Sequence, residues 1–229
     1  MRRLLWDSII HGDFACAFPN GSRDGCATIP TEKHGEKGGV GRRDPKRKQE
    51  SMTEQKTWQD AHAIPGALTK QDIYALLDAH GMAYEAVEHP PVFTVEEADA
   101  LAKLPFACHE AKNFFLRDPK HREYYLVTVP DHKKVDLKEL QAQLGSKRLS
   151  FASAEDLAGK IGIYPGAVTP FAALNAEPGS IHVALDADFR RWGQIGCHPC
   201  SNTASVHVRT DDLLALLSEA GHEVAFVEL

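Results

Sequence analysis

Two apolar runs separated by a polar turn stand near the middle of the 229-residue chain: Lys112-Asn113-Phe114-Phe115-Leu116-Arg117, then Asp118-Pro119-Lys120-His121-Arg122, then Glu123-Tyr124-Tyr125-Leu126-Val127-Thr128-Val129. Aromatic and β-branched residues favour strands, and the Asp-Pro pair between the two runs favours a turn. The pattern therefore predicts a β-hairpin with strands at 112–117 and 123–129.

Helical and extended patterns alternate on both sides of this hairpin. Thr69 to Asp72 has the pattern of a capping box, and apolar residues recur at helical spacing after it until His80 and Gly81. Helices interspersed with hairpins predict an α/β (α+β) fold, a single domain with a mixed, mostly antiparallel sheet and flanking helices. We expect helices at 69–80, 94–101, 136–144, 153–161 and 210–220, and further strands at 84–88, 181–185, 204–208 and 223–227.

The first 51 residues differ in composition from the rest. They hold ten Lys and Arg, seven Asp and Glu and seven Gly, and the run from Gly35 to Lys48 has almost nothing to bury. Such a segment cannot offset the entropy of its own ordering. Two explanations stay open: residues 1–51 form a disordered leader, or the start codon is assigned too early and Met52 begins the protein. We predict a flexible lead-in at 52–66 and a folded domain at 67–229.

Composition excludes several classes of protein. The apolar runs are far shorter than the roughly 20 residues that cross a bilayer. Asp7 interrupts the short apolar stretch at Leu4, so the N-terminus lacks the pattern of a signal peptide. Five irregularly spaced cysteines do not indicate a disulfide framework. We predict a cytoplasmic protein that contacts neither membrane nor DNA.

Charge is distributed unevenly along the chain. The whole chain carries −6, residues 52–229 carry −9, and within them residues 112–148 carry +4. An acidic body repels phosphate in general, whereas a local basic patch fits a protein that touches one end of a nucleic acid at a defined place. A solvated charged hairpin is the alternative reading of the same residues.

Lys112 stands out within the predicted hairpin. With the period of two of a strand, its side chain shares a face with Phe114 and Leu116. Because lysine is almost never buried unpaired, we expect this ammonium to emerge into a cleft or to meet a carboxylate. The alternative is a lysine that reaches solvent at the strand end.

The stretch from Gly162 to Phe171 (Gly-Ile-Tyr-Pro-Gly-Ala-Val-Thr-Pro-Phe) contains two prolines and two glycines, which forbid regular structure. Such a loop can present backbone N–H groups to a carbonyl oxygen or a ribose. It lacks the lysine and the spacing of a phosphate-binding P-loop, so nucleotide hydrolysis is not indicated. A plain connecting loop is the alternative.

A Cys-x-x-Cys pair lies in the segment from Gly196 to Ala204 (Gly-Cys-His-Pro-Cys-Ser-Asn-Thr-Ala). A redox role favours a helix after the first cysteine, but strand-prone residues follow here. A zinc site needs two more ligands, and only Cys108 and His109 suggest themselves. Zinc and thiol–disulfide chemistry remain minor alternatives, and we expect no metal or cofactor.

Four segments in this order resemble the YbaK/prolyl-tRNA-synthetase-associated editing domains, and among them the freestanding alanyl-tRNA(Pro) deacylases. The resemblance runs from about Ala67 to Leu229. The segments that carry it are His89-Pro90-Pro91-Val92-Phe93-Thr94-Val95-Glu96-Glu97, Lys112 to Asp118, Gly162 to Phe171, and Gly196 to Pro199 with Asn202-Thr203-Ala204.

The resemblance implies hydrolysis of the ester that joins a wrong amino acid to the terminal adenosine of proline tRNA. A pocket built for proline cannot strongly exclude the smaller alanine, since missing methylenes cost only roughly 1–3 kcal/mol each. A second site that admits alanine and excludes proline by size is the physical remedy. Water, helped by the 2′-hydroxyl of the adenosine, is the expected nucleophile.

The resemblance also assigns roles to individual residues. Lys112 is expected to hold the phosphate or ribose of the terminal adenosine, and amides near Gly166 and Ala167 to polarise the ester carbonyl. The expected catalytic residues are Lys112, Asn113 and His198; the expected substrate-binding residues are Gly166, Ala167, Thr169, Pro170, Asn202 and Thr203; the expected tRNA-binding residues are Arg117, Lys120 and Arg122.

Alternatives to this function stay open. Cys197 and Cys200 stand where relatives often carry bulkier apolar residues, so cysteinyl-tRNA(Pro) is the nearest substitute substrate. A module that binds tRNA or a metabolite without turnover is a further alternative. The expected partner is the acceptor end of tRNA(Pro), with prolyl-tRNA synthetase as a candidate second partner.

Overall fold

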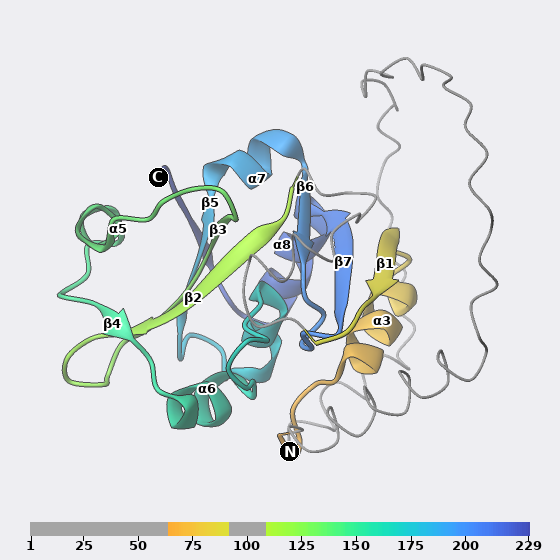
Figure 1. Ribbon diagram of the computed structural model, residues 1–229, viewed down its shortest axis with the longest axis horizontal. Coiled ribbons are helices and arrows are strands. Elements are labelled where there is room, and N and C mark those ends of the chain that lie inside the picture. Colours follow the sequence, from red (N-terminus) through yellow and green to blue (C-terminus); the bar gives the residue numbers. More distant parts are fainter. Residues whose placement is uncertain (1–63, 92–108) are drawn as a thin grey trace, which may run out of the picture. The chain divides into compact units, whose positions relative to one another are not determined.

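The computed structural model describes residues 64–91 and 109–229, all within the compact unit Met52–Leu229 (Figure 1). The predicted helix at 94–101 and the predicted leader lie outside the described residues. The elements are α3 (Lys70–Ala79), β1 (Tyr84–Glu88), β2 (Ala111–Arg117), β3 (Tyr124–Pro130), α5 (Leu137–Leu144), β4 (Ser150–Phe151), α6 (Ala154–Ile161), the 3₁₀ helix η1 (Pro170–Asn175), β5 (His182–Asp186), α7 (Ala187–Trp192), β6 (Gln194–Cys197), β7 (Ala204–Arg209), α8 (Thr210–Glu219) and β8 (Val224–Val227).

The predicted hairpin is confirmed as β2 and β3, which pair antiparallel with Asn113 opposite Thr128. They belong to a five-stranded sheet of order β4-β2-β3-β5-β8, in which β3, β5 and β8 run parallel. A second, antiparallel sheet has the order β1-β7-β6. The predicted fold class is therefore confirmed, with strands divided between a mixed and an antiparallel sheet.

One bridge joins the two sheets. Glu110, just before β2, pairs in parallel with Gly196 of β6. The Gly196 N–H donates to the His109 carbonyl at 2.9 Å. A Cβ at position 196 would lie 2.9 Å from Glu110 Oε1, so a larger residue there would displace the Glu110 carboxyl group. The start of β2 is thereby fixed beside the end of β6.

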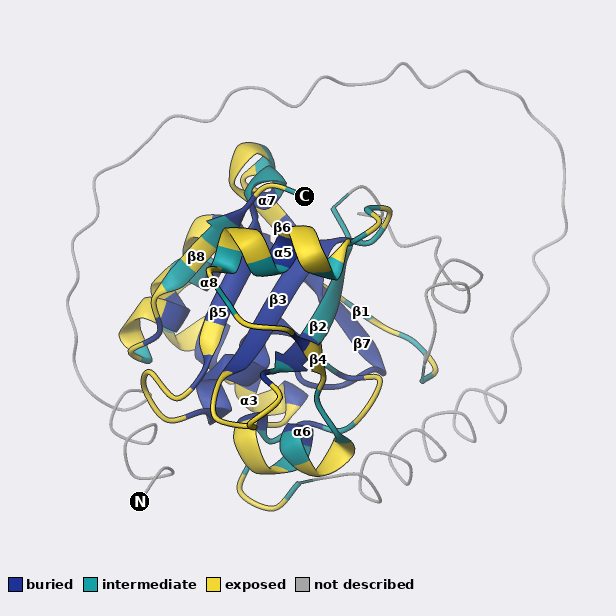
Figure 2. Cartoon of the chain, turned by 90° about the vertical axis from the view of Figure 1, so that its left-hand side faces the viewer, coloured by how far each residue is buried: buried dark blue, intermediate teal, exposed yellow. Residues whose placement is uncertain are grey.

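The apolar core explains why β3 is buried along its whole length, as the dark blue strand in Figure 2 shows. On one face of the sheet, Leu116 and Val127 pack with Leu140 of α5, and the exposed residues of α5 lie on its outer side. Burying such side chains stabilises the fold by about 1.5–3 kcal/mol each.

The helix starts follow local sequence signals. Thr69 caps α3 and Ser153 caps α6, each in a complete capping box. Gly145 ends α5 in the left-handed conformation. The sequence did not predict β4, α7, β6 or η1, and η1 corrects the expectation that Pro170 and Phe171 lie in irregular structure. Within residues 64–91 and 109–229 no helix is long and apolar enough to span a membrane.

Candidate active site

The candidate site lies where the beginning of β2 meets the end of β6. The bridge between Glu110 and Gly196 sets these segments side by side and in parallel (Figure 1). Lys112 and His198 each follow the bridge by two residues in their own segment. Two residues predicted to act together thus lie two positions beyond the same bridge.

Lys112 is half-buried, and its ammonium is held by backbone. Nζ donates to the Asp131 carbonyl at 2.8 Å and to the Lys133 carbonyl, both just after β3. Burial lowers the pKa of Lys112, while the nearby Asp131 carboxylate opposes the shift. The expected carboxylate partner is therefore replaced by two carbonyl oxygens, which fix the ammonium without neutralising it.

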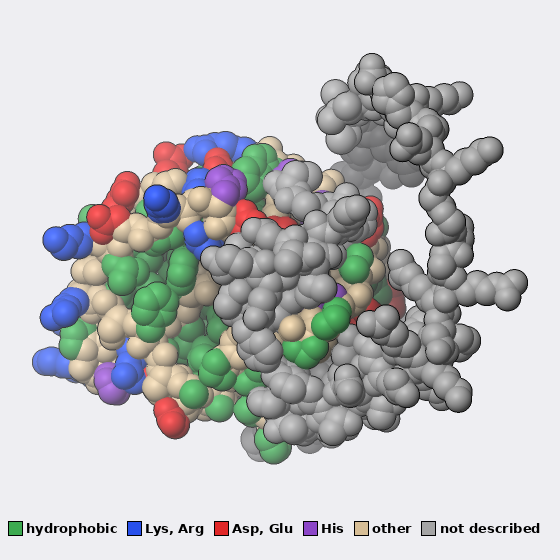
Figure 3. All heavy atoms as spheres, viewed as in Figure 1, with side chains coloured by type: hydrophobic (Ala, Val, Ile, Leu, Met, Phe, Trp, Pro, Cys, Tyr) green, Lys and Arg blue, Asp and Glu red, His purple; other side chains and the backbone are tan. Residues whose placement is uncertain are grey.

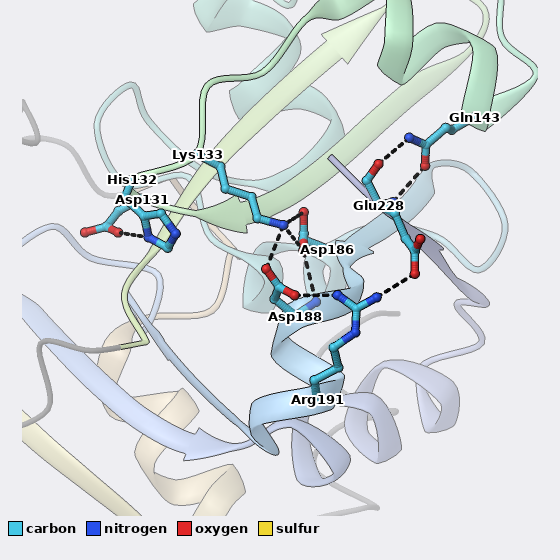
Figure 4. Close-up of polar contacts among 8 residues, drawn as sticks. All are labelled: Asp131, His132, Lys133, Gln143, Asp186, Asp188, Arg191 and Glu228. Atoms are coloured by element: carbon cyan, nitrogen blue, oxygen red, sulfur yellow. Dashed lines mark hydrogen bonds and ion pairs between the residues drawn. The ribbon is translucent and has the colours of Figure 1, made fainter.

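A polar network anchors the loop that holds Lys112 (Figure 4). Lys133 Nζ donates to Asp186 Oδ1 at 2.8 Å and Oδ2 at 2.9 Å, and lies 2.7 Å from Asp188 Oδ2. Arg191 connects Asp188 to Glu228, at 2.5 and 2.6 Å. The Asp186 side chain is 0% exposed and that of Lys133 17%, so this ion pair is buried. The network ties the Lys133 backbone to the start of α7.

Asn113 points to the opposite face of β2 from Lys112, as strand alternation requires. Its Oδ1 accepts a hydrogen bond from Thr128 Oγ1 at 2.8 Å. Thr128 is fully buried. The structure therefore does not bring the side chains of Lys112 and Asn113 together.

The loop between α6 and η1 is built on a tight turn. Pro165 and Gly166 form its corner, with Gly166 at φ +88°, a value that favours glycine. The Ala167 N–H donates to the Tyr164 carbonyl at 3.2 Å, and Ala167 is fully buried. This corrects the expectation for Ala167, because its amide is used within the turn. The exposed Gly166 amide is the donor that this loop can present.

Thr169 connects this loop to the His198 segment. Its hydroxyl donates to the His198 carbonyl at 2.5 Å, and its side chain is fully buried. Pro170 follows as the first residue of η1 and is also buried. Two segments that the sequence singled out separately are thus joined directly.

The His198 imidazole is held in one tautomer. Nδ1 lies 2.8 Å from the Ala204 carbonyl, and a carbonyl only accepts, so Nδ1 carries the hydrogen. Burial lowers the pKa of His198 to about 4, which keeps the ring neutral at pH 7. The His89 ring lies 5.9 Å away, and burial lowers its pKa as well. Nε2 of His198 is therefore an unprotonated acceptor.

This burial predicts a dependence of stability on pH. The unfolded chain takes up the His198 proton near its ordinary pKa of 6.5, whereas the folded protein does so near 4. The contribution to the free energy of unfolding is full above pH 6.5 and is lost as pH falls to 4, by up to about 3 kcal/mol. Urea unfolding between pH 4 and 7 measures it.

The matched variant is His198→Gln, which removes this titration. We expect its free energy of unfolding to fall less steeply between pH 6.5 and 4 than that of the wild type. His89 contributes in the same direction in both proteins, so the comparison isolates His198. Identical slopes would contradict the assignment of a half-buried His198 that is neutral in the folded protein.

Asn202 and Thr203 are fully buried beneath the same segment. The Tyr164 hydroxyl lies 3.4 Å from Asn202 Oδ1, and Lys70 Nζ lies 3.3 Å from Thr203 Oγ1. Lys70 also pairs with Glu88 at the end of β1. These two predicted substrate-binding residues therefore use side-chain atoms to hold the segment in place.

Comparisons with known proteins identify the family of this chain. The sequence model of the family "Aminoacyl-tRNA editing domain" matches residues 89–216, more than half of the chain. The chain belongs to the aminoacyl-tRNA editing domain family. The predicted enzyme class, an aminoacyl-tRNA deacylase, is thereby confirmed, as is the resemblance.

Curated members of the editing family cover most of this chain. The "Prolyl-tRNA editing protein ProX" of Acetoanaerobium sticklandii is 36% identical over 160 residues, 70% of this chain and 97% of the relative. The "Prolyl-tRNA synthetase associated domain-containing protein 1" of Bos taurus is 34% identical over 168 residues, 70% of this chain and 95% of the relative. The solved structure of "hypothetical protein APE2540" shares the fold, with a TM-score of 0.53, 21% identity, and coverage of 69% of this chain and 99% of that one.

Sequence reasoning missed one ionisable residue of this editing domain. Glu110 is mostly buried against Gly196, and its Oε1 has no hydrogen-bond partner among the described residues. Burial, with a contribution from Asp131, raises the pKa of Glu110 to about 7. Glu110 directly precedes β2, the strand whose sequence contributed to the resemblance. The neighbouring residues give no sign that this glutamate lies where the two sheets meet.

The two cysteines of the Cys-x-x-Cys pair are free and buried. Burial raises the pKa of both thiols, so they stay protonated and are poor nucleophiles. Cys200 has φ 58°, a left-handed conformation. Among the described residues, no group of three or more His, Cys, Asp and Glu could hold a metal ion; Cys108 lies outside them.

The three predicted tRNA-binding residues of the editing domain divide into two groups. Arg117 is paired with Asp156, which also accepts from the Tyr124 hydroxyl at 2.8 Å. Against the opposing effect of burial, hydrogen bonds from the Ser153 backbone N–H, the Tyr124 hydroxyl and the Ser153 hydroxyl, together with the Arg117 charge, lower the pKa of Asp156 to about 2. Arg117 therefore serves the junction of β2 with α6, whereas Lys120 and Arg122 are exposed in the β2–β3 turn.

Proposed function

We propose that the chain hydrolyses the ester of mischarged tRNA(Pro), with alanyl-tRNA(Pro) as substrate. One observation carries the proposal: a fixed ammonium and a neutral imidazole lie at the paired ends of β2 and β6. The relatives named as prolyl-tRNA editing proteins support the choice of proline tRNA.

Lys112 would bind the end of the tRNA. An ammonium has three N–H groups, and the two carbonyls after β3 use two of them. The third would donate to a phosphate oxygen beside the terminal adenosine. Because the ammonium is already held, little side-chain entropy is lost when the substrate binds.

His198 and Gly166 would act on the reacting ester. Nε2 of His198 would accept a hydrogen bond from the attacking water or from the adenosine 2′-hydroxyl. The Gly166 N–H would stabilise the negative charge on the carbonyl oxygen in the tetrahedral intermediate. The bond from the carbonyl carbon to the ribose 3′ oxygen then breaks, the ribose oxygen takes the proton from water, and the free amino acid leaves.

The remaining predicted residues would shape and support the pocket. Thr169 and Pro170 would position the Gly166 turn against His198, and Asn202 and Thr203 would hold the segment behind it. Asn113 would act through the buried Thr128. We also propose that 67–229 is the catalytic domain and that the protein works in the cytoplasm, where it meets charged tRNA and prolyl-tRNA synthetase.

The test is a panel of three substrates: Ala-tRNA(Pro), Cys-tRNA(Pro) and Pro-tRNA(Pro). We expect alanine to be released at least about 10–200-fold faster than proline, since this is the range that a single methylene gives in a hydrophobic pocket. Release is measured from radiolabelled amino acid under single-turnover conditions. Faster release of cysteine than of alanine would reassign the amino acid, and tight tRNA binding without any release would favour a binding module.

A further inference from the structure

Two phenylalanines form an aromatic surface next to Lys112. Phe114 is half-buried on β2, and Phe151 of β4 is 60% exposed. Their ring centroids lie 6.0 Å apart with an interplanar angle of 58°. Phe151 is the one large hydrophobic side chain that is exposed among the described residues. Much of the Phe151 side chain is therefore open to solvent beside the Phe114 ring.

Strand geometry places this aromatic surface in line with Lys112. Lys112, Phe114 and Leu116 alternate on one face of β2, and Phe151 pairs with Leu116 across the β2–β4 ladder. From Lys112 to Phe114 the strand rises about 7 Å, which equals about two base steps at roughly 3.4 Å, and Leu116 beyond them is buried in the core. In Figure 3 hydrophobic side chains gather on this side of the molecule, with Lys and Arg along its margin.

Four exposed cations surround the far end of this surface. Lys120 and Arg122 lie in the turn after β2, and Lys147 and Arg148 precede β4. Arg117 pairs with Ser150, which brings the turn and the start of β4 to the same end of the sheet. The domain outside 112–148 is strongly acidic, so these cations mark the face that attracts phosphate.

We propose that Phe151 and Phe114 stack against unpaired bases at the 3′ end of the substrate tRNA, between the exposed cations and Lys112. The inference rests on the proposed function and describes how the site binds the single-stranded end of its substrate. Aromatic rings beside a basic track are the means by which proteins hold single-stranded nucleic acid. A protein partner fits less well, because lysine is depleted in protein interfaces.

The experiment measures binding of uncharged tRNA(Pro) to Phe151→Ala by fluorescence anisotropy. We expect binding about 5- to 100-fold weaker than wild type, the range for loss of one stacked base. Phe151→Trp should restore binding to within about twofold, because indole also stacks. The matched control is Phe226→Ala, which removes a half-buried ring from β8 at the opposite edge of the same sheet.

A second readout reports stacking itself. We expect 2-aminopurine in the unpaired 3′ segment to be quenched when wild type binds and to remain bright with Phe151→Ala at saturating protein. The inference is overturned if Phe151→Ala leaves both tRNA binding and quenching unchanged. It is overturned in the same way if such a variant loses binding to prolyl-tRNA synthetase, because Phe151 would then contact a protein. Because uncharged tRNA is the ligand, a wild type that binds and quenches but does not deacylate would overturn the proposed function alone.

Discussion

Lys112→Ala is expected to lower kcat/KM for alanyl-tRNA(Pro) deacylation by about 10²–10³-fold, the loss typical for removal of one preorganised donor. Its ammonium is already fixed by the Asp131 and Lys133 carbonyls, so no other side chain can take its place at low cost. Single-turnover release of labelled alanine measures the effect.

Lys112→Arg is the matched control for charge. The guanidinium keeps the positive charge but is planar and larger, so it does not fit between two carbonyls that hold a tetrahedral ammonium. We expect the arginine variant to recover less than a tenth of the lost activity. Full activity in Lys112→Ala would remove this residue from the mechanism.

Lys133→Met is expected to lower the free energy of unfolding by about 3–5 kcal/mol, because it leaves the fully buried Asp186 carboxylate without its cation. Methionine keeps most of the length of the side chain, so the change isolates the charge. Urea unfolding at pH 7, followed by circular dichroism, gives the value.

Arg191→Met provides the comparison for this stability prediction. The Arg191 side chain is 58% exposed, and its ion pairs with Asp188 and Glu228 lie at the surface. Exposed pairs contribute about 0–1 kcal/mol. Equal losses in the two variants would show that the Lys133 pair is no more buried in solution than the Arg191 pair.

Elements with a local signal could be predicted from the sequence. The hairpin of β2 and β3 and the capping boxes at Thr69 and Ser153 depend on residues within a few positions of one another. In contrast, β6 is four residues long and contains Gly196, which has low strand propensity. Its ladder partner β7 is near in the chain, but the bridge that places it beside β2 is to the distant Glu110. The helix α7 begins at Ala187, and its N-cap Asp186 is the last residue of β5, so no loop between them marks the start of the helix.

The sequence indicated which residues belong to the candidate site, but it did not indicate which atoms they contact. The motifs selected Lys112, Thr169 and His198, and the bond between Thr169 and His198 joins two of these motifs. The partners of Lys112 are backbone carbonyls, which a side-chain pattern cannot show. Arg117 was assigned to tRNA because its carboxylate partner, Asp156, lies 39 residues further along the chain.

The pairing of β1 with β7 has a consequence for synthesis on the ribosome. Tyr84 pairs with Val208, and the His89 N–H donates to the Thr203 carbonyl, so β1 and His89 have to wait for the emergence of residues about 120 positions later. The β2–β3 hairpin can form long before that, whereas pairings distant in sequence form slowly. The nascent domain can therefore form its β2–β3 hairpin early, but it acquires the rest of its sheets and the complete site only near the end of translation.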